Sequence, residues 1–120
     1  HTRAPAGGFT LRAGVAEIPH PDKASYGGED SWFLSDDGSA MGVADGVSEW
    51  GWRFGLNPRH FAQELMEGAR AAAEEATAGG AQERAAAALC RGHDGVRSFG
   101  AATALVLVLD AAGGEVGIAS

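Results

Sequence analysis

The sequence has little cysteine and little positive charge, and both shortages narrow the range of proteins it can represent. Its single cysteine, Cys90, cannot form an internal disulfide, so we expect no disulfide scaffold and infer no oxidising compartment. Nine basic residues stand against sixteen acidic ones, for a formal net charge of −7. Nucleic acids and anionic membrane surfaces favour proteins with a basic stripe, so we expect neither to be the main partner.

Long apolar runs are also missing. No stretch approaches the ~20 apolar residues that a membrane-spanning helix requires, and no signal-peptide pattern is visible. Apolar residues nevertheless make up 45% of the 120 positions, which is enough for the buried core of one domain or of part of one. Residues 1–8, with a proline and a glycine pair, are predicted to be a loose lead-in, and residues 9–120 to be the folded portion.

The spacing of apolar residues predicts strands first, then two helices, then strands again. The predicted strands are 9–18, 31–35, 40–44, 101–109 and 115–119. One helix is expected to begin at Asn57-Pro58, which supply a cap and a first-turn proline, and to end at Gly79-Gly80. A second helix is expected from Ala81 to Cys90. This order favours a layered α+β fold, with a helical hairpin packed on a sheet, over the alternation of a Rossmann fold.

The clearest local prediction is a hairpin formed by the second and third of these strands. Asp37-Gly38 is a strong two-residue turn, and the register that it sets pairs Asp30 with Asp45 at the open end of the hairpin. Opposed side chains in such a pair lie about 4.5–5.5 Å apart, so two carboxylates there repel each other. They are stable together when one is protonated or when a cation lies between them.

The ligand types next to this pair favour a hard cation. Glu29 lies beside Asp30, and Gly46 follows Asp45, where the lack of a side chain would let a metal or its waters approach the backbone carbonyl. Oxygen ligands without a cluster of cysteine and histidine favour Mg²⁺ or Mn²⁺ over zinc. An ordinary structural interpretation stays open, because Asp-Gly pairs are common in turns and Glu-Asp before a strand is a common polar edge. A register slip of one residue would also place Asp30 and Asp45 on opposite faces.

Several segments of the chain, taken in order, resemble one enzyme family. They are His20-Pro21-Asp22-Lys23, Gly27-Gly28-Glu29-Asp30, Val43 to Trp50, Asn57-Pro58, Phe61 to Met66 and Thr103 to Leu109. From about Gly14 onward they are similar to the plant-type, organelle-associated branch of the type-2C (PPM) metal-dependent protein phosphatases. The resemblance implies a β-sandwich flanked by helices, of which this chain would be the amino-terminal half. It also implies a location in the chloroplast or mitochondrion.

The resemblance further implies a serine/threonine phosphatase that acts on phosphoproteins with two Mg²⁺ or Mn²⁺ ions at one rim of the sandwich. The family's bridging aspartate corresponds to Asp45, and the glycine that supplies a carbonyl ligand corresponds to Gly46. The carboxylates at the positions of Glu29 and Asp30 hold metal-bound water. In this family a metal-activated water attacks phosphorus directly, without a phospho-enzyme intermediate.

Three positions depart from the family's pattern. Val47 stands where many members have a histidine as general acid, which leaves a metal-bound water as the proton donor. Ser25 stands at the spacing of the phosphate-binding arginine, so Lys23 is the candidate replacement in that catalytic role. Glu49 replaces a glycine that the family pattern has before Trp50.

The family would continue beyond this sequence into a Gly-Asp-Ser segment and further metal-binding aspartates, so we expect the chain to be an incomplete domain. Three functions therefore stay open. The first is a phosphatase that is complete in its full-length form. The second is a non-catalytic pseudophosphatase fragment or interaction module, and the third is a simple divalent-ion-binding domain.

Overall fold

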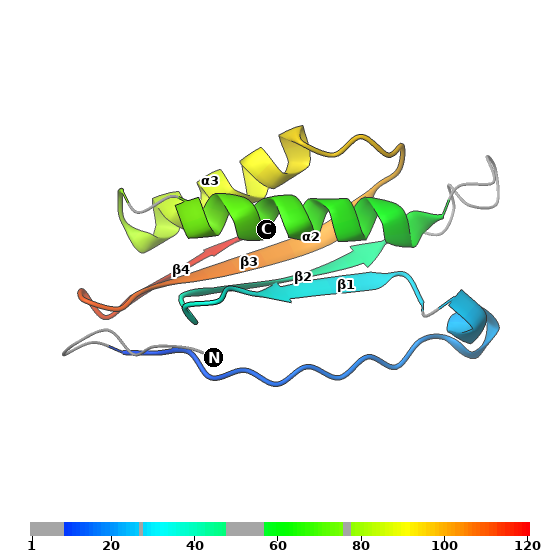
Figure 1. Ribbon diagram of the computed structural model, residues 1–120, viewed down its shortest axis with the longest axis horizontal. Helices are drawn as coiled ribbons and strands as arrows, with labels where there is room; N and C mark the ends of the chain where they lie inside the picture. The colour runs from blue at the N-terminus through cyan, green and yellow to red at the C-terminus, as the bar shows by residue number, and fades with distance from the viewer. Residues whose placement is uncertain (1–8, 27, 48–56, 76–77) are drawn as a thin grey trace.

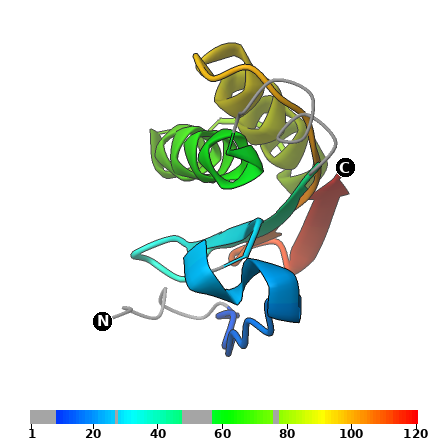
Figure 2. The same ribbon diagram turned by 90° about the vertical axis from the view of Figure 1, so that its right-hand side faces the viewer.

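The computed structural model describes residues 9–26, 28–47, 57–75 and 78–120 (Figure 1). Within them lies a four-stranded antiparallel sheet in the order β1-β2-β3-β4. The strands are β1 (Asp30–Leu34), β2 (Ala40–Gly46), β3 (Ala102–Asp110) and β4 (Glu115–Ala119), and the helices are η1 (a 3₁₀ helix, Pro21–Tyr26), α2 (Pro58–Glu75) and α3 (Ala81–Asp94). Both α-helices cover one face of the sheet (Figure 2), which confirms the α+β fold with a packed helical hairpin.

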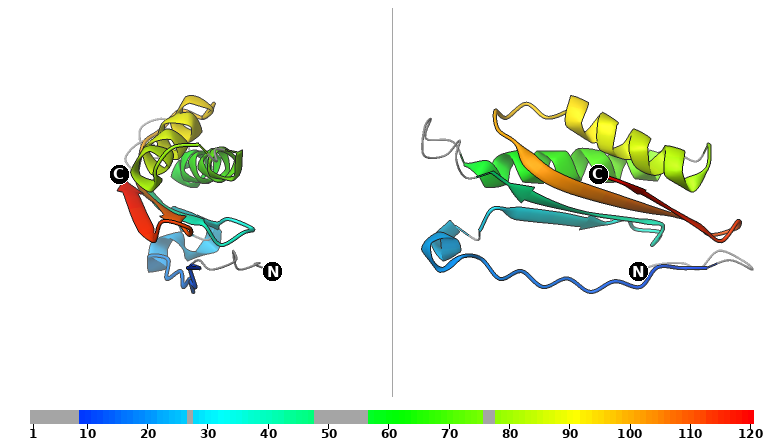
Figure 3. Two further views of the ribbon diagram at one scale, coloured as in Figure 1. Left: turned by 90° about the vertical axis from the view of Figure 1, so that its left-hand side faces the viewer. Right: turned by 180° about the vertical axis from the view of Figure 1, so that it is seen from behind.

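The predicted strand at residues 9–18 is wrong, because this part of the described chain forms no strand. The segment runs extended along the side of the sheet that faces away from the helices (Figures 1 and 3), and Phe9 N–H donates to Ala111 O at 3.3 Å. Alternating side chains meet one requirement of a strand, but a strand also needs a neighbouring backbone with matching donors and acceptors. Leu11 and Val15 instead line cavities between this segment and the sheet.

The predicted hairpin register is confirmed, although the turn differs. β1 and β2 pair Asp30 with Asp45 and Phe33 with Gly42. The connection comprises residues 35–39, in which Gly38 adopts a φ of 70°. Ser35 N–H donates to Ala40 O at 2.9 Å, which is the pairing that the two-residue turn also implies. The register therefore survives the change of loop type.

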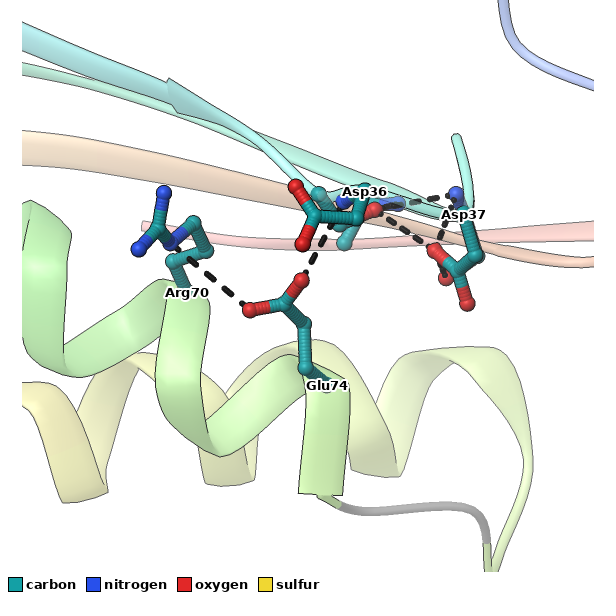
Figure 4. A network of polar contacts seen from close by, with 7 residues as sticks. Asp36, Asp37, Arg70 and Glu74 are labelled. Atoms are coloured by element: carbon teal, nitrogen blue, oxygen red, sulfur yellow. Dashed lines mark hydrogen bonds and ion pairs between the residues drawn. The ribbon is translucent and has the colours of Figure 1, made fainter. Parts of the chain in front are cut away.

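A network of polar contacts holds the tip of the hairpin to α2 (Figure 4). Asp37 Oδ1 accepts hydrogen bonds from the Ser35 hydroxyl at 2.8 Å and from the Ser39 N–H at 2.9 Å. Asp36 N–H donates to Glu74 Oε2 at 3.1 Å, and Glu74 also forms an ion pair with Arg70 at 3.7 Å. The tip is thus fixed both within its own loop and against the helical layer.

The core lies between the sheet and the helices. The largest fully buried side chains are those of Met66, Val106 and Val108. Phe33 packs over Gly42, where an added Cβ would lie 2.3 Å from the phenyl ring. A bulky residue opposite a glycine fills the space at interior density, and this pair favours the observed register.

The two α-helices approach each other closely because their contact surface consists of small residues. Gly92 of α3 lies against α2, and a Cβ there would be 2.7 Å from Ala69 N and 2.9 Å from Leu65 O. The predicted stripe of α2 is confirmed, since its members are all buried: Phe61, Leu65, Ala69 and Ala73. The second helix extends beyond the predicted end at Cys90, to Asp94.

The opposite face of the sheet is apolar and open among the described residues. Five of its large apolar side chains are 39–55% exposed: Trp32, Val43, Leu105, Val116 and Ile118. An apolar row of this kind on a sheet usually marks a surface that another layer covers.

The two ends of β3 differ in their neighbours. β2 pairs with β3 from Ala102 to Val108, whereas β4 pairs with it from Val106 to Asp110. In the part of the chain that the structure describes, the first half of β3 therefore has a strand on one side alone (Figure 3). On the outer edge of β4, the Gln82 side chain exchanges two hydrogen bonds with the backbone of Ile118, at 2.7 and 3.0 Å.

Candidate active site

The end of the hairpin opposite its tip brings together acidic side chains from different segments. Asp30 opens β1 and faces Asp45 near the end of β2, as predicted. The β2–β3 register adds Thr103 as the next residue in the same row. All three line a cavity of about 400 Å³ on the open face of the sheet, together with Glu17 from the extended segment.

The electrostatics of this cavity agree with the predicted repulsion. Partial burial raises the pKa of Asp30, and a hydrogen bond with Asp45 and the charge of that carboxylate raise it further. Glu17 and Glu29 add smaller contributions of the same sign. A carboxyl group in this position therefore holds its proton more readily than usual, unless a cation offsets the negative charge.

Glu29 lies beside Asp30 but is buried, with 5% of its side chain exposed. Its Oε1 forms an ion pair with the ammonium group of Lys23 on η1. Its Oε2 is buried and has no hydrogen-bond partner in the described part of the chain. The structure therefore brings the predicted residues Lys23 and Glu29 together, and it leaves one buried carboxylate oxygen unsatisfied.

Gly46 connects this site to the start of α2. Its N–H donates to Glu29 O at 3.1 Å, and a Cβ at this position would lie 2.5 Å from Pro58 O and 2.9 Å from Glu29 O. Position 46 therefore requires glycine so that the backbones of Glu29 and Pro58 can approach it. This is a second reason for glycine, besides the carbonyl ligand that the sequence suggests. Val47, which follows, donates its N–H to Ala101 O at 2.9 Å.

Sequence reasoning missed a cation at this end of the sheet. Asn57 Oδ1 accepts the N–H of Arg59 at 3.0 Å and so caps α2, as predicted. The Arg59 guanidinium reaches Gly28 O, at 3.5 Å, next to Glu29. The two residues are 31 positions apart, so no local spacing signals the contact. Thr103 and Glu17 were missed for the same reason, since tertiary packing alone brings them to the cavity.

The residues present fit part of a cation site. The donors are carboxylate and carbonyl oxygens, which suit Mg²⁺ or Mn²⁺, and the unpartnered Glu29 oxygen is a vacant acceptor beside them. Among the described residues, no three side chains of histidine, cysteine, aspartate or glutamate are grouped so that they could hold an ion. The position of Glu49, where the sequence departs from the family's pattern, lies outside the described residues.

The fold has a counterpart among solved structures. The X-ray structure of the photosystem II phosphatase PBCP matches 78% of this chain with a TM-score of 0.63 and 37% sequence identity, over 36% of its own length. The sheet and its helical layer thus define a portion of an α+β phosphatase fold. No family model matches the chain.

Sequence comparison leads to the same group of proteins. The chain is 41% identical over 100 residues to "Probable protein phosphatase 2C BIPP2C1" of rice (Oryza sativa subsp. japonica), and 35% identical over 111 residues to "Probable protein phosphatase 2C 26" of Arabidopsis thaliana. Over the matched residues the chain is thus a homologue of plant protein phosphatases 2C. The matches cover 83% and 92% of this chain, but 17% and 35% of the two relatives, so the chain spans a minor part of their length.

Two further findings concern partners. No helix in the described ranges is long and apolar enough to cross a membrane. Cys90 is exposed and is the sole cysteine of the sequence, so the chain has no internal disulfide.

Proposed function

We propose that this chain carries part of the active site of a metal-dependent protein serine/threonine phosphatase. One observation carries the proposal: Asp30 and Asp45 face each other at one end of the sheet, in a chain homologous to type-2C phosphatases. Directly opposed carboxylates are costly in a metal-free fold, and a divalent cation between them removes that cost.

Asp45 and the carbonyl of Gly46 would hold Mg²⁺ or Mn²⁺ directly, with Asp30 and Glu29 holding its water ligands. Two bound ions supply the positive charge that neutralises the phosphoryl oxygens and lowers the pKa of a water molecule. The chain's own residues contribute the geometry: the β1–β2 register sets the spacing of the two aspartates, and the missing side chain of Gly46 lets the Glu29 backbone approach.

The phosphate of a phosphoserine or phosphothreonine would be bound at the same end of the sheet. Lys23 is our candidate for this role because its ammonium lies beside Glu29, adjacent to Asp30. Arg59 approaches the same loop from α2. A guanidinium or ammonium group at this point would orient a dianionic phosphate towards the aspartates.

A second candidate function is a non-catalytic interaction module. It is favoured by the incomplete set of ligands in the described residues. Such a module would keep the fold without hydrolysing phosphoproteins.

The test is the substitution Asp45→Asn in the full-length protein. We expect Mn²⁺-dependent hydrolysis of a phosphothreonine peptide to fall by roughly two orders of magnitude or more, because the proposed bridging charge is lost. The control is Asp36→Asn, which changes an exposed aspartate at the opposite end of the same hairpin and should leave activity unchanged. Near-normal activity of Asp45→Asn would refute the proposal, and an inactive wild-type protein would favour the interaction module.

A further inference from the structure

The ion pair between Lys23 and Glu29 is the feature that the proposed function does not yet explain. Glu29 is among the few buried charged residues of the described chain, with 5% of its side chain exposed, whereas Lys23 retains 27%. A buried carboxylate is unstable without a positive charge nearby. Lys23 supplies that charge to Oε1, but Oε2 stays buried without a hydrogen-bond partner among the described residues.

The backbone holds Lys23 in this place. Its N–H donates to His20 O at 2.8 Å inside the 3₁₀ turn, and its carbonyl accepts the N–H of Gly28 at 3.1 Å. Gly28 directly precedes Glu29, so the main chain and the side chain of Lys23 are both tied to the segment that carries the carboxylate. The ammonium is therefore tethered at short range, whereas its side chain keeps rotatable bonds that would let it move away.

The position of Glu29 places this ion pair next to the proposed cation site. Glu29 O accepts the N–H of Gly46, and Asp30 follows it in sequence and faces Asp45. A divalent cation near these groups would attract the free oxygen of Glu29 and would repel the ammonium of Lys23. The ammonium of Lys23 and a divalent cation would repel each other strongly if both lay against the buried Glu29 carboxylate.

We propose that Lys23 is a tethered counter-ion, which neutralises Glu29 in the metal-free protein and is displaced when Mn²⁺ or Mg²⁺ binds. This inference rests on the proposed metal site. Displacement frees the ammonium at the moment when the site becomes competent, so Lys23 becomes available to a substrate phosphate after metal binding and not before. Metal loading and phosphate binding are thereby coupled through one residue.

The first experiment measures Mn²⁺ affinity by calorimetry in the full-length protein and in Lys23→Gln. Removing the competing charge should lower the Kd for Mn²⁺ by roughly three- to tenfold, the effect of one nearby unit charge in a highly polarisable site. The melting temperature in chelator should fall, because Glu29 is then left buried without a counter-charge. Arg91→Gln is the matched control: it removes a cation and its ion pair with Glu75 on the helical layer, and should not change the Kd.

The second experiment needs no variant and therefore does not depend on the stability of Lys23→Gln. Acetylation of Lys23 by a lysine-reactive reagent, followed by mass spectrometry, should increase when Mn²⁺ is added to the wild-type protein. An unchanged or lower rate of acetylation, or an unchanged Kd in a folded Lys23→Gln protein, would overturn the proposal. Absence of any Mn²⁺ binding by the wild-type protein would instead refute the metal site itself, so the two failures are distinguishable.

Discussion

Two aspartates of the same hairpin respond to their surroundings in opposite ways. At the open end, burial and the neighbouring carboxylates raise the pKa of Asp30. At the tip, burial would also raise the pKa of Asp37, but hydrogen bonds from Ser39 and Ser35 to the carboxylate outweigh it and lower that pKa. A carboxylate that accepts several hydrogen bonds stabilises the fold, whereas two carboxyl groups that face each other are stable together when one is protonated or a cation lies between them.

The lowered pKa of Asp37 predicts a pH dependence of stability. Because the folded pKa lies below the unfolded one, the stabilisation is present in full above the unfolded pKa and is lost as the pH falls through the folded pKa. Asp37→Asn should therefore be less stable than the wild type at neutral pH, and the difference should vanish in strong acid. Urea titrations from pH 7 to about 2 measure this. A constant difference at every pH would show that packing, and not charge, is responsible.

At the level of the element, the two α-helices pack closely because small residues lie at their contact surface. Gly92 allows α3 to contact the backbone of α2, with a hypothetical Cβ 2.7 Å from Ala69 N. Alanine is a better helix former than glycine by roughly 1 kcal/mol, so helix propensity alone would favour a substitution here. Overpacking of a tight interface typically costs about 1–3 kcal/mol, and rigid backbone atoms on both sides leave little room to adjust.

We therefore expect Gly92→Ala to destabilise the protein by about 1–2 kcal/mol, because the clash outweighs the gain in helix propensity. Gly95→Ala is the control, since a Cβ there would meet its nearest neighbour at an ordinary 3.6 Å. It should be neutral or slightly stabilising. Chemical denaturation measures both variants, and a more stable Gly92→Ala would mean that the helices can separate without cost.

The elements also show what the sequence could predict. The register of Asp30 and Asp45 was predictable, because strand pairing follows from the position of the turn, and both possible loop types imply the same pairs. The ion pair of Lys23 with Glu29 was not, because it depends on a 3₁₀ turn whose direction no periodic pattern encodes. The failed strand at 9–18 has the same cause, since a strand depends on a partner that its own residues do not reveal.

At the scale of the whole molecule, the sheet has two unlike faces. The face under the helices is closed, with Val106 0% exposed, whereas Val43 on the other face is 55% exposed. The β-sandwich that the family resemblance implies would cover the open face with a second sheet. The exposed apolar row is the kind of surface that such a second sheet would cover.

A pair of matched substitutions tests this difference between faces in the 120-residue polypeptide. Val43→Thr should change the free energy of unfolding by less than about 0.5 kcal/mol and should reduce binding of the dye ANS. Val106→Thr should cost about 1–3 kcal/mol, because it buries a hydroxyl without a partner. Thermal melts and dye fluorescence give both quantities. Equal costs in this polypeptide would mean that the open face is already covered, whereas in the full-length protein we expect Val43→Thr to become costly as well.

The unequal lengths of β3 and β4 have a consequence for assembly of the site. Asp30, Asp45 and Thr103 occupy successive strands of one transverse row, and in the described chain the row ends at the half of β3 that β4 does not reach. Neighbouring strands lie about 4.8 Å apart, so a residue that pairs with Thr103 on its open side would lie roughly 10 Å from Asp45. A backbone segment that pairs with this free edge of β3 would therefore be placed, by its hydrogen-bond register, in the same row as Asp30 and Asp45.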